Sequence, residues 1–459
     1  MTQTTTMAPI DRNSLPRNKV RIGMLSLGCP KTLVDSENIL GGLSSDAYSL
    51  VPSVTDCDVA LLNTCSFIQD SKEESIDRIL ELIELKKEKK IRALVVIGCL
   101  VQRYPKHLRA ELKEVDAFIG SGDYHKIPGL LKNVLQGERV FAVSTPGYLA
   151  TSAEARVALT PKHYRYLKIS EGCDHICTFC AIPSFRGRHR SRSIEDIVNE
   201  AEELARQGAK ELILTGQDTT YFGRDFTGEF MLPDLLARLD NVKGVEWLRL
   251  LYAYPSCITD KLISGLKKSR LLCRYLDMPL QHASDPMLTA MKRGISKDRT
   301  YDLIKKLRDA IPGLAMRTTF IVGFPGETEK DFKELLKFME DIRFERLGIF
   351  IYSQEDNTPA EQLPNQVPQK LARERFEQAM ELQQIISTKN NETLLGQKMR
   401  VLIDEKSADE NHVWIGRTHM DAPEVDGSVF VHSKKPIQTG EFYSVRVTAT
   451  KEYDLVAEI

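Results

Sequence analysis

The chain has 459 residues, of which 42% are hydrophobic and 28% are charged, and its formal net charge is −1. This composition predicts a soluble globular protein of about three domains at ~150 residues each, and the balanced charge does not favour nucleic acid as the main substrate. No stretch approaches the ~18 consecutive apolar residues of a membrane span. Nine cysteines without the spacing of a secreted module indicate a reducing compartment, so we expect a cytoplasmic protein that does not contact a membrane.

The N-terminal third begins with a polar, Thr-rich segment, residues 1–18, which predicts a disordered tail. Residues 19–143 then alternate between apolar strands and helices, a pattern typical of a parallel sheet covered on both faces. Three strands are expected, within residues 19–29, 57–67 and 92–102. A helix is expected to begin at Asp35 and another to cover residues 71–90, and residues 144–160 are interpreted as a linker.

Residues 161–390 resume the alternation with longer helices. Six strands are expected, and they lie within residues 164–170, 211–218, 245–255, 274–281, 315–324 and 346–354. Amphipathic helices such as residues 194–208 and 329–342 separate them, and a charged helix at residues 368–391 follows. Six β/α units without the glycine fingerprint of a dinucleotide-binding fold predict an α/β core shaped as a partial (β/α)6 TIM-like barrel.

The last segment, residues 391–459, changes to short alternating strands, which predicts a small five-stranded β-barrel of OB type. Between residues 396 and 459 there are eleven Asp and Glu against eight Lys and Arg. An RNA-binding barrel needs a basic face, whereas an acidic one favours a basic protein partner. We therefore expect this barrel to attract a basic protein.

Cys173, Cys177 and Cys180 form a C-x3-C-x2-C array directly after the first predicted barrel strand. One interpretation is half of a zinc site, with His175 or His189 as the fourth ligand. The other is an iron–sulfur cluster that leaves one iron open for a small molecule. The array lies where such barrels place their chemistry, at the C-terminal ends of the strands.

A second set of cysteines, Cys29, Cys65 and Cys99, is dispersed in the sequence, but each stands at the end of a predicted strand. The C-terminal ends of parallel strands share one edge, so we expect the three thiols to converge there. The alternative is three buried core cysteines. The remaining Cys57, Cys257 and Cys273 show no such pattern and are interpreted as packing residues.

The spacing of the first array, its place after a barrel strand and the aromatic Phe179 resemble the radical S-adenosylmethionine (SAM) superfamily. The resemblance implies a 4Fe–4S cluster whose open iron binds SAM and cleaves it to a 5′-deoxyadenosyl radical. It also implies SAM contacts from Phe179 and from two later strand ends, where a tight turn is the alternative interpretation. These positions are Thr215, Gly216, Gln217, Asp218, Val322, Gly323 and Phe324.

The order of the three predicted domains and the six cysteines resemble the methylthiotransferase family, whose C-terminal part is a TRAM domain. This resemblance implies a second 4Fe–4S cluster on Cys29, Cys65 and Cys99. It implies replacement of a C–H bond by C–S–CH3, with SAM as both radical source and methyl donor. A sulfur donor and an electron donor are then required as partners.

The stretch LGCPKTLVDSEN, residues 27–38, resembles the ribosomal-protein branch of that family, although Thr32 replaces the usual Asn. The transfer-RNA branch typically has Gln-Met-Asn after the first cysteine. The resemblance implies methylthiolation of the β-carbon of an aspartate in small-subunit ribosomal protein S-twelve, either free or within the ribosome. Two rivals remain, a transfer-RNA methylthiotransferase and a non-catalytic iron–sulfur or zinc scaffold that binds ribosomes.

The basic run FRGRHRSRS, residues 185–193, does not discriminate between the branches. It could bind RNA phosphates, or it could be a solvated loop whose arginines pair with substrate carboxylates or with nearby acidic groups.

Overall fold

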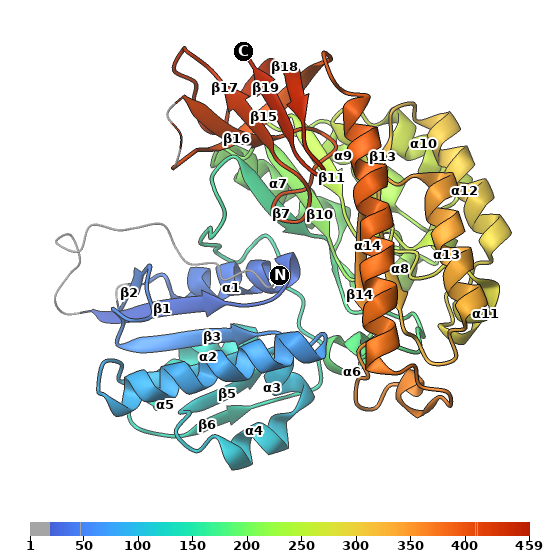
Figure 1. Cartoon of the computed structure of the whole chain (residues 1–459). Coiled ribbons are helices and arrows are strands. Elements are labelled where there is room, and N and C mark those ends of the chain that lie inside the picture. The colour runs from blue at the N-terminus through green and yellow to red at the C-terminus, as the bar shows by residue number, and fades with distance from the viewer. Residues whose placement is uncertain (1–18, 46, 409, 411) are drawn as a thin grey trace.

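The computed structural model describes residues 19–45, 47–408, 410 and 412–459, so the tail predicted for residues 1–18 lies outside the described part. The described chain forms two six-stranded parallel sheets and one closed β-barrel (Figure 1). No helix within these ranges is long and apolar enough to cross a membrane. The predicted α/β class with a C-terminal five-stranded barrel is confirmed.

The N-terminal sheet has the strand order β2-β1-β3-β4-β5-β6, and every neighbouring pair is parallel. Its strands are β1 (Val20–Ser26), β2 (Tyr48–Val51), β3 (Val59–Thr64), β4 (Ala93–Gly98), β5 (Ala117–Gly120) and β6 (Val140–Ala142). The three strands expected from the sequence are β1, β3 and β4. The other three have at most four residues each, which is too short for an apolar pattern to stand out.

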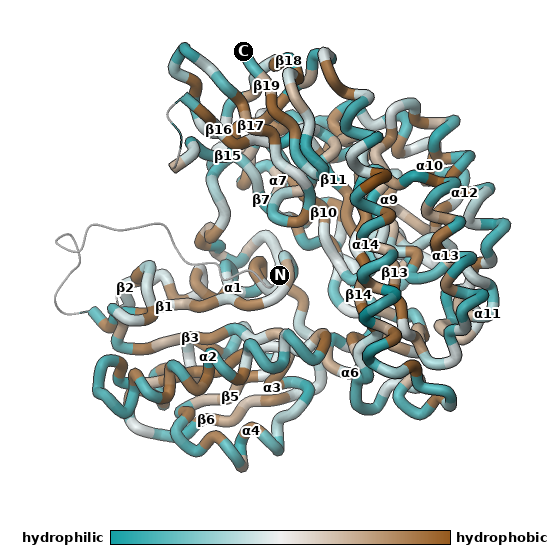
Figure 2. Tube along the Cα trace, in the orientation of Figure 1, coloured by the Kyte–Doolittle hydropathy of each residue, from teal (hydrophilic) through white to brown (hydrophobic). Residues whose placement is uncertain are grey.

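Both faces of this sheet are covered, as its alternating side chains require. Val59 and Leu61 pack toward one face and Ala60 and Leu62 toward the other. The first face carries α1 (Pro30–Leu43) and α5 (Ile127–Leu135), which follows a short helix η2 (Tyr124–Lys126). The second carries α2 (Gln69–Lys87), α3 (Cys99–Arg103) and α4 (Pro105–Glu111). Figure 2 shows the hydrophobic strands of this unit beside more hydrophilic helices.

Helix α1 begins at Pro30, and the expectation of a start at Asp35 was wrong. Pro30 occupies the first helical position, where its fixed φ suits a helix and its missing N–H is not needed. Cys29 is the N-cap residue, and its carbonyl accepts the first helical hydrogen bonds, from the backbone N–H groups of Thr32 and Leu33. The earlier start places a candidate ligand directly at the positive end of a helix.

The second sheet has the order β14-β13-β12-β11-β10-β7, again all parallel. Its strands are β7 (Tyr164–Lys168), β10 (Glu211–Thr215), β11 (Trp247–Leu250), β12 (Leu272–Asp277), β13 (Ala315–Val322) and β14 (Arg346–Ile351). A two-stranded ribbon of β8 (Ser170–Glu171) and β9 (Arg190–Ser191) follows β7. The sheet does not close, so β7 and β14 are its edges.

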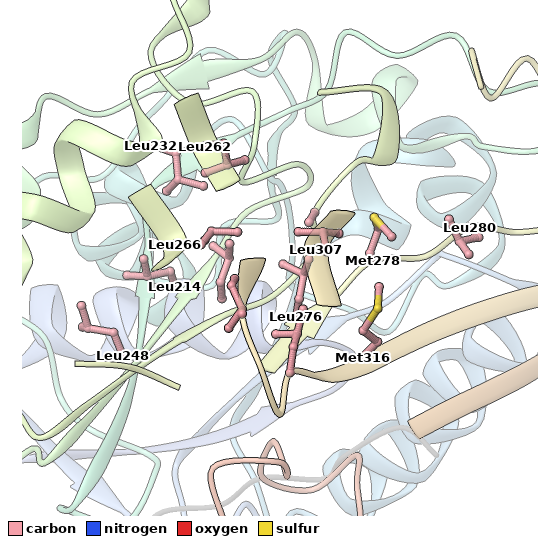
Figure 3. Packing of buried hydrophobic residues seen from close by; sticks show 14 of the residues in the cluster. Leu214, Leu232, Leu248, Leu262, Leu266, Leu276, Met278, Leu280, Leu307 and Met316 are labelled. Carbon is pink, nitrogen blue, oxygen red and sulfur yellow. The ribbon is translucent and has the colours of Figure 1, made fainter. Parts of the chain in front are cut away.

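Leucines and methionines from neighbouring strands pack outward onto a layer of helices (Figure 3). The longer helices of this layer are α7 (Ile194–Arg206), α9 (Leu232–Leu239), α10 (Asp260–Lys268), α12 (Lys297–Ala310), α13 (Glu329–Ile342) and α14 (Gln369–Glu392). Shorter helices are α6 (Ile182–Arg186), α8 (Arg224–Thr227), α11 (Asp285–Ala290), η3 (Pro255–Cys257) and η4 (Pro359–Gln362). The opposite face of the strands, with Tyr166, Ile213 and Tyr275, packs together with residues of α1 and of the C-terminal barrel.

The C-terminal barrel closes in the order β15-β16-β17-β19-β18 around its own small core. Its strands are β15 (Lys398–Lys406), β16 (Val413–Arg417), β17 (Val429–His432), β18 (Phe442–Thr450) and β19 (Leu455–Glu458). In Figure 1 it lies against β7, β10 and β11. Trp247, the first residue of β11, contacts Phe442 of β18 with ring centroids 4.7 Å apart.

Several acidic residues of this barrel are buried at its contact with the α/β core. Asp421 pairs with Arg346, with 2.9 Å between Nε and the carboxylate, and it is 1% exposed. Asp426 lies 3.3 Å from Arg317 and accepts a hydrogen bond from Tyr275. These carboxylates neutralise arginines of the core, so part of the acidic balance of the barrel is internal, whereas Glu405, Glu410, Glu424, Glu452 and Glu458 are exposed.

We predict that Asp421→Ala strongly destabilises the whole chain, because it leaves the Arg346 guanidinium buried without its anion. Removing one partner of a buried pair costs about 3–5 kcal/mol. The measurement is the free energy of unfolding from urea titration. Asp309→Ala is the control, since its pair with Lys305 is exposed and should contribute little. Equal urea midpoints for the two variants would contradict the prediction.

Candidate functional site

The three predicted radical-SAM cysteines lie on one loop that follows β8 at the C-terminal end of the sheet. Cys177 is buried, and its Sγ lies 3.3 Å from Arg293 Nη1 and 3.6 Å from the Tyr254 hydroxyl. Burial, together with the neighbouring thiols, raises the pKa values of Cys173 and Cys180 to about 12. All nine cysteines are free, so this loop offers three clustered thiols to a thiophilic group.

His175 fixes the conformation of this loop. Its ring stacks on Tyr254 with centroids 3.5 Å apart, and its Nε2 lies 2.6 Å from Asp218 Oδ2. The other oxygen of Asp218 accepts from the backbone N–H of Thr220 at 2.8 Å. The donor atoms of His175, Asp218 and Cys257 lie within 4.8 Å of one another, close enough to hold a metal ion. Asp218, predicted to contact SAM, has both oxygens engaged by the protein.

The other predicted SAM contacts fall into two groups, polar residues at the ends of the first two strands and mainly hydrophobic residues at a later strand end. Three buried polar atoms near the ends of the first two barrel strands have no hydrogen-bond partner among the described residues. They are Ser170 Oγ, Thr215 Oγ1 and Gln217 Oε1. Gly216 lies so close to Ser170 Oγ that an added Cβ would approach it to 2.6 Å. Buried, unsatisfied polar atoms are expected where a polar ligand completes the site. These atoms and the three thiols therefore fit a 4Fe–4S cluster with SAM.

At the later strand end, Val322 and Phe324 are buried and hydrophobic, and Phe179 packs beside Phe324. Gly323 has φ +74°, and a Cβ there would lie 2.5 Å from the Cβ of Ala372 in α14. Its N–H donates to Glu327. Gly323 is thus required for close packing against a helix; Val322 ends β13, and Gly323 and Phe324 follow it.

The second predicted set also meets at one edge. Cys29 caps α1 after β1, Cys65 follows β3, and Cys99 begins α3 after β4. A Cβ on Gly28 would lie 3.1 Å from Cys65 Sγ, which shows that the first two segments approach closely. All three thiols act electrostatically on one another. The parallel sheet has brought three distant cysteines together, as the strand-end argument predicts.

A glycine stands directly before three of the six candidate ligands, and sequence reasoning missed this signal. Gly28, Gly98 and Gly172 have φ values of +99°, +104° and +81°. A Cβ on Gly98 would come within 2.3 Å of Asn63 Oδ1, and one on Gly172 within 2.0 Å of the Arg188 carbonyl oxygen. Both the backbone conformation and the space require glycine, so the Gly-Cys dipeptide marks a tight turn into each ligand.

Arg186 connects the two cysteine sets. It ends α6, the short helix after Cys180, and donates from Nε and Nη2 to Cys99 Sγ at 3.2 and 3.0 Å. Its Nη1 lies 2.7 Å from Asp35 of α1 and 3.3 Å from Glu171. Lys168 of β7 binds the same two carboxylates. Sequence reasoning missed this network because a basic run does not reveal which of its arginines is buried.

The cations shift the thiol pKa values. Burial raises the pKa of Cys99 to about 12, although Arg186 opposes the rise. Burial acts in the same direction on Cys29, but the cations of Lys31 and Arg186 and hydrogen bonds from Thr32 outweigh it and lower its pKa. Thr32 Oγ1 lies 3.6 Å from Cys29 Sγ. A thiol at a helix N-terminus beside two cations is poised to become a thiolate ligand.

The rest of the basic run is mainly internal. Arg192 is buried and pairs with Asp196 and Glu200. Arg188 is exposed and pairs with Asp174. The interpretation that these arginines pair with nearby acidic groups is confirmed for Arg186, Arg188 and Arg192.

The N-terminal sheet is fixed to both edges of the open core sheet. On the β7 side, Glu37 accepts from Arg156 and from the backbone N–H of Leu159. On the β14 side, Glu355 pairs with Lys72 at 2.9 Å and with Arg103 at 2.6 Å. The second cysteine set is therefore held beside the incomplete barrel.

Sequence families match each of these units. The radical SAM superfamily matches residues 167–339, the uncharacterized protein family UPF0004 matches residues 21–120, and the TRAM domain matches residues 395–459. The fold and the cysteine loop thus define a radical SAM enzyme, a class that uses a 4Fe–4S cluster and SAM. A solved radical SAM methyltransferase, TsrM from Kitasatospora setae, shares this fold with a TM-score of 0.55 over 75% of each chain at 14% identity.

Curated relatives identify the family more narrowly. The ribosomal protein uS12 methylthiotransferase RimO of Pelotomaculum thermopropionicum is 49% identical over 96% of this chain and 99% of its own length. RimO of Desulforamulus reducens is 45% identical over 95% of this chain and 99% of its own. The chain belongs to the RimO family of methylthiotransferases.

We predict that Gly98→Ala prevents loading of the N-terminal site, because its Cβ collides with Asn63 and with the carbonyl of Thr64. Gly137→Ala is a matched control, since Gly137 also has a positive φ, +89°, but nothing within 4 Å. Gly98 also has ψ −153°, a backbone conformation open essentially only to glycine, so Gly98→Ala adds backbone strain to the collision, and both effects act at this turn. The measurement is iron bound per chain after anaerobic reconstitution. Equal iron in the two variants would refute the steric argument.

We also predict that Arg186→Gln lowers the free energy of unfolding by about 3–5 kcal/mol, because it removes a cation from two buried carboxylates. Arg188→Gln serves as the control, because Arg188 comes from the same basic run but is exposed. Urea titration of the apoprotein measures the effect without any cofactor. If both variants unfold at the same urea concentration, the Arg186 network is not what joins the units.

Proposed function

We propose that this chain transfers a methylthio group to the β-carbon of an aspartate in ribosomal protein uS12, using two 4Fe–4S clusters and SAM. The observation that carries the proposal is the junction at Arg186. This residue lies six positions after Cys180 on the SAM side and donates two hydrogen bonds to Cys99 on the other side. Arg186 thus links the two sets of three free thiols, through the chain to Cys180 and through hydrogen bonds to Cys99, and this arrangement suits a reaction that combines radical generation with sulfur delivery.

Each set has its own role in the proposal. Cys173, Cys177 and Cys180 hold the cluster that binds SAM, with Arg293 and Tyr254 beside Cys177. When bound, this cluster and SAM supply the electron and the carbon radical that can remove hydrogen from an unactivated carbon, a step beyond side-chain acid–base chemistry. Ser170, Thr215 and Gln217 offer polar atoms to SAM.

Cys29, Cys65 and Cys99 hold the second cluster, which carries the sulfur. Arg186 orients the Cys99 thiolate, and the helix dipole of α1 and Lys31 stabilise that of Cys29. The ion pairs of Glu37 and Glu355 hold the N-terminal unit, and with it the second set, against the core. Electron and sulfur donors remain partners that this proposal requires.

The protein substrate is supported by two features. The relatives that match almost the full length are named for uS12. Arg186 and Arg192, which an RNA-binding basic run would need on the surface, are buried in ion pairs. A transfer-RNA substrate has no comparable support from the residues described.

We predict different losses from the two cysteine sets. Cys177→Ala should abolish formation of 5′-deoxyadenosine, because it removes a ligand of the SAM-binding cluster. Cys65→Ala should retain some cleavage but give no methylthio product on uS12. Chromatography of 5′-deoxyadenosine and mass spectrometry of uS12 measure the two outcomes. Full methylthiolation by Cys65→Ala would contradict the role of the second set.

Iron content gives an independent test of the same division. The reconstituted wild type should hold about eight irons per chain, since each cubane has four. Cys65→Ala and Cys177→Ala should each lose about half. Cys57→Ala is the control, because Cys57 is buried in the hydrophobic core of the N-terminal sheet and should keep the full count. Stoichiometric zinc without sulfide would instead support a non-catalytic scaffold.

A further inference from the structure

Lys31 is a buried cation without a carboxylate partner. It is the second residue of α1, two positions after Cys29, and it is 8% exposed. Its Nζ lies 3.4 Å from the centroid of the Tyr252 ring. Among the residues that the structure describes, no Asp or Glu lies within ion-pair distance of it. The neighbouring buried Lys168, in contrast, binds both Asp35 and Glu171.

A buried ammonium group of this kind is expected to have an anion beside it. Buried charges in proteins are normally paired, because removal from water is unfavourable unless another charge compensates for it. The face of an aromatic ring compensates only in part. Lys31 meets the side chain of Tyr252, through its ring and a hydrogen bond, and the charge of the Cys29 thiol, while the nearby Arg186 cation opposes its charge.

Tyr252 is held in an unusual conformation beneath Lys31. Its φ is +59°, a left-handed value that is rare for a bulky residue and characteristic of functional sites. Its backbone N–H donates to Asp277 at 3.1 Å, and its carbonyl accepts from the backbone N–H of Thr219 at 3.1 Å. Tyr252 follows β11 at the C-terminal end of the core sheet. Lys31 of the N-terminal unit therefore reaches the strand ends where the radical chemistry takes place.

We propose that Lys31 is a specificity-determining residue that binds the side-chain carboxylate of the target residue. The inference rests on the proposed function and deepens it. The β-carbon of an aspartate is bonded directly to its carboxylate, so an ion pair at Lys31 would fix the reacting carbon between the two cysteine sets. A neutral amide of the same shape would leave the ammonium without its anion, which disfavours an asparagine at the same position.

A competing role for Lys31 is to balance the negative charge of the Cys29 thiolate and the group it holds. That role would affect the N-terminal site equally for every substrate. Carboxylate recognition, in contrast, changes the preference between two substrates. A ratio of rates measured within one variant therefore separates the two roles, and it is insensitive to the fraction of enzyme that is folded or loaded.

The experiment uses reconstituted full-length enzyme with purified uS12 carrying the target aspartate, or asparagine in its place. The wild type should prefer the aspartate form in kcat/KM by about ten- to a hundredfold, the range for one charge-assisted hydrogen bond. Lys31→Met should bring this ratio close to one, mainly through KM for the aspartate form. Lys31→Arg, which keeps the charge, should retain most of the preference.

Lys87→Met is the control, because Lys87 lies on the exposed side of α2 and pairs with Glu84. It should leave the ratio at the wild-type value. An unchanged ratio in Lys31→Met, or an equal loss with both substrates, would overturn the inference and assign Lys31 to the cluster or to SAM. If the wild type forms no methylthio product on uS12, the proposed function itself fails, and that result is visible before any variant is made.

Discussion

The arrangement of this molecule depends on the buried ion network around Arg186. Asp35 and Glu171 come from different units, and each receives both Lys168 and Arg186. The four charged groups are nearly inaccessible to water, so each carboxylate is stable only while both cations remain in place. The network therefore holds α1, β7 and α6 in one fixed relation. Cys29 lies at the start of α1, and the loop with Cys173, Cys177 and Cys180 lies between β8 and α6, so the network fixes these two segments relative to each other.

The ligands themselves are set by the backbone. In three of six cases a glycine with positive φ precedes the cysteine, and in each case a side chain at that glycine would strike a neighbouring segment. The turns between strand and ligand are consequently tight, and the thiols start from nearly fixed positions. A metal cluster requires ligands in nearly fixed positions, because its bonds form only when each ligand atom lies close to the right place.

The C-terminal barrel supports the opposite end of the core sheet. Its acidic residues Asp421 and Asp426 neutralise Arg346 and Arg317, and its Arg417 lies 2.8 Å from the buried Glu211. The composition alone suggests that these charged residues lie on the surface. In the structure they form ion pairs that join the barrel to the core sheet. The N-terminal sheet at the strand ends and the barrel at the strand starts together enclose a sheet that does not close by itself.

The sequence alone determined the local and periodic features. Apolar runs ending in Cys29, Cys65 and Cys99 predicted three parallel strands with ligands at one edge, because side-chain period and strand ends are local properties. The spacing of Cys173, Cys177 and Cys180 predicted a single thiol loop for the same reason. What only the tertiary structure decided is which charges are buried against which. Arg186 and Arg188 have the same chemistry two positions apart, yet one contacts Cys99 and the other faces solvent. Asp35 and Asp421 likewise pair with residues more than 70 positions away. Lys31 has no carboxylate partner among the residues that the structure describes. Such pairings depend on how separate units pack against one another. A local sequence pattern does not predict contacts between residues so far apart in the chain.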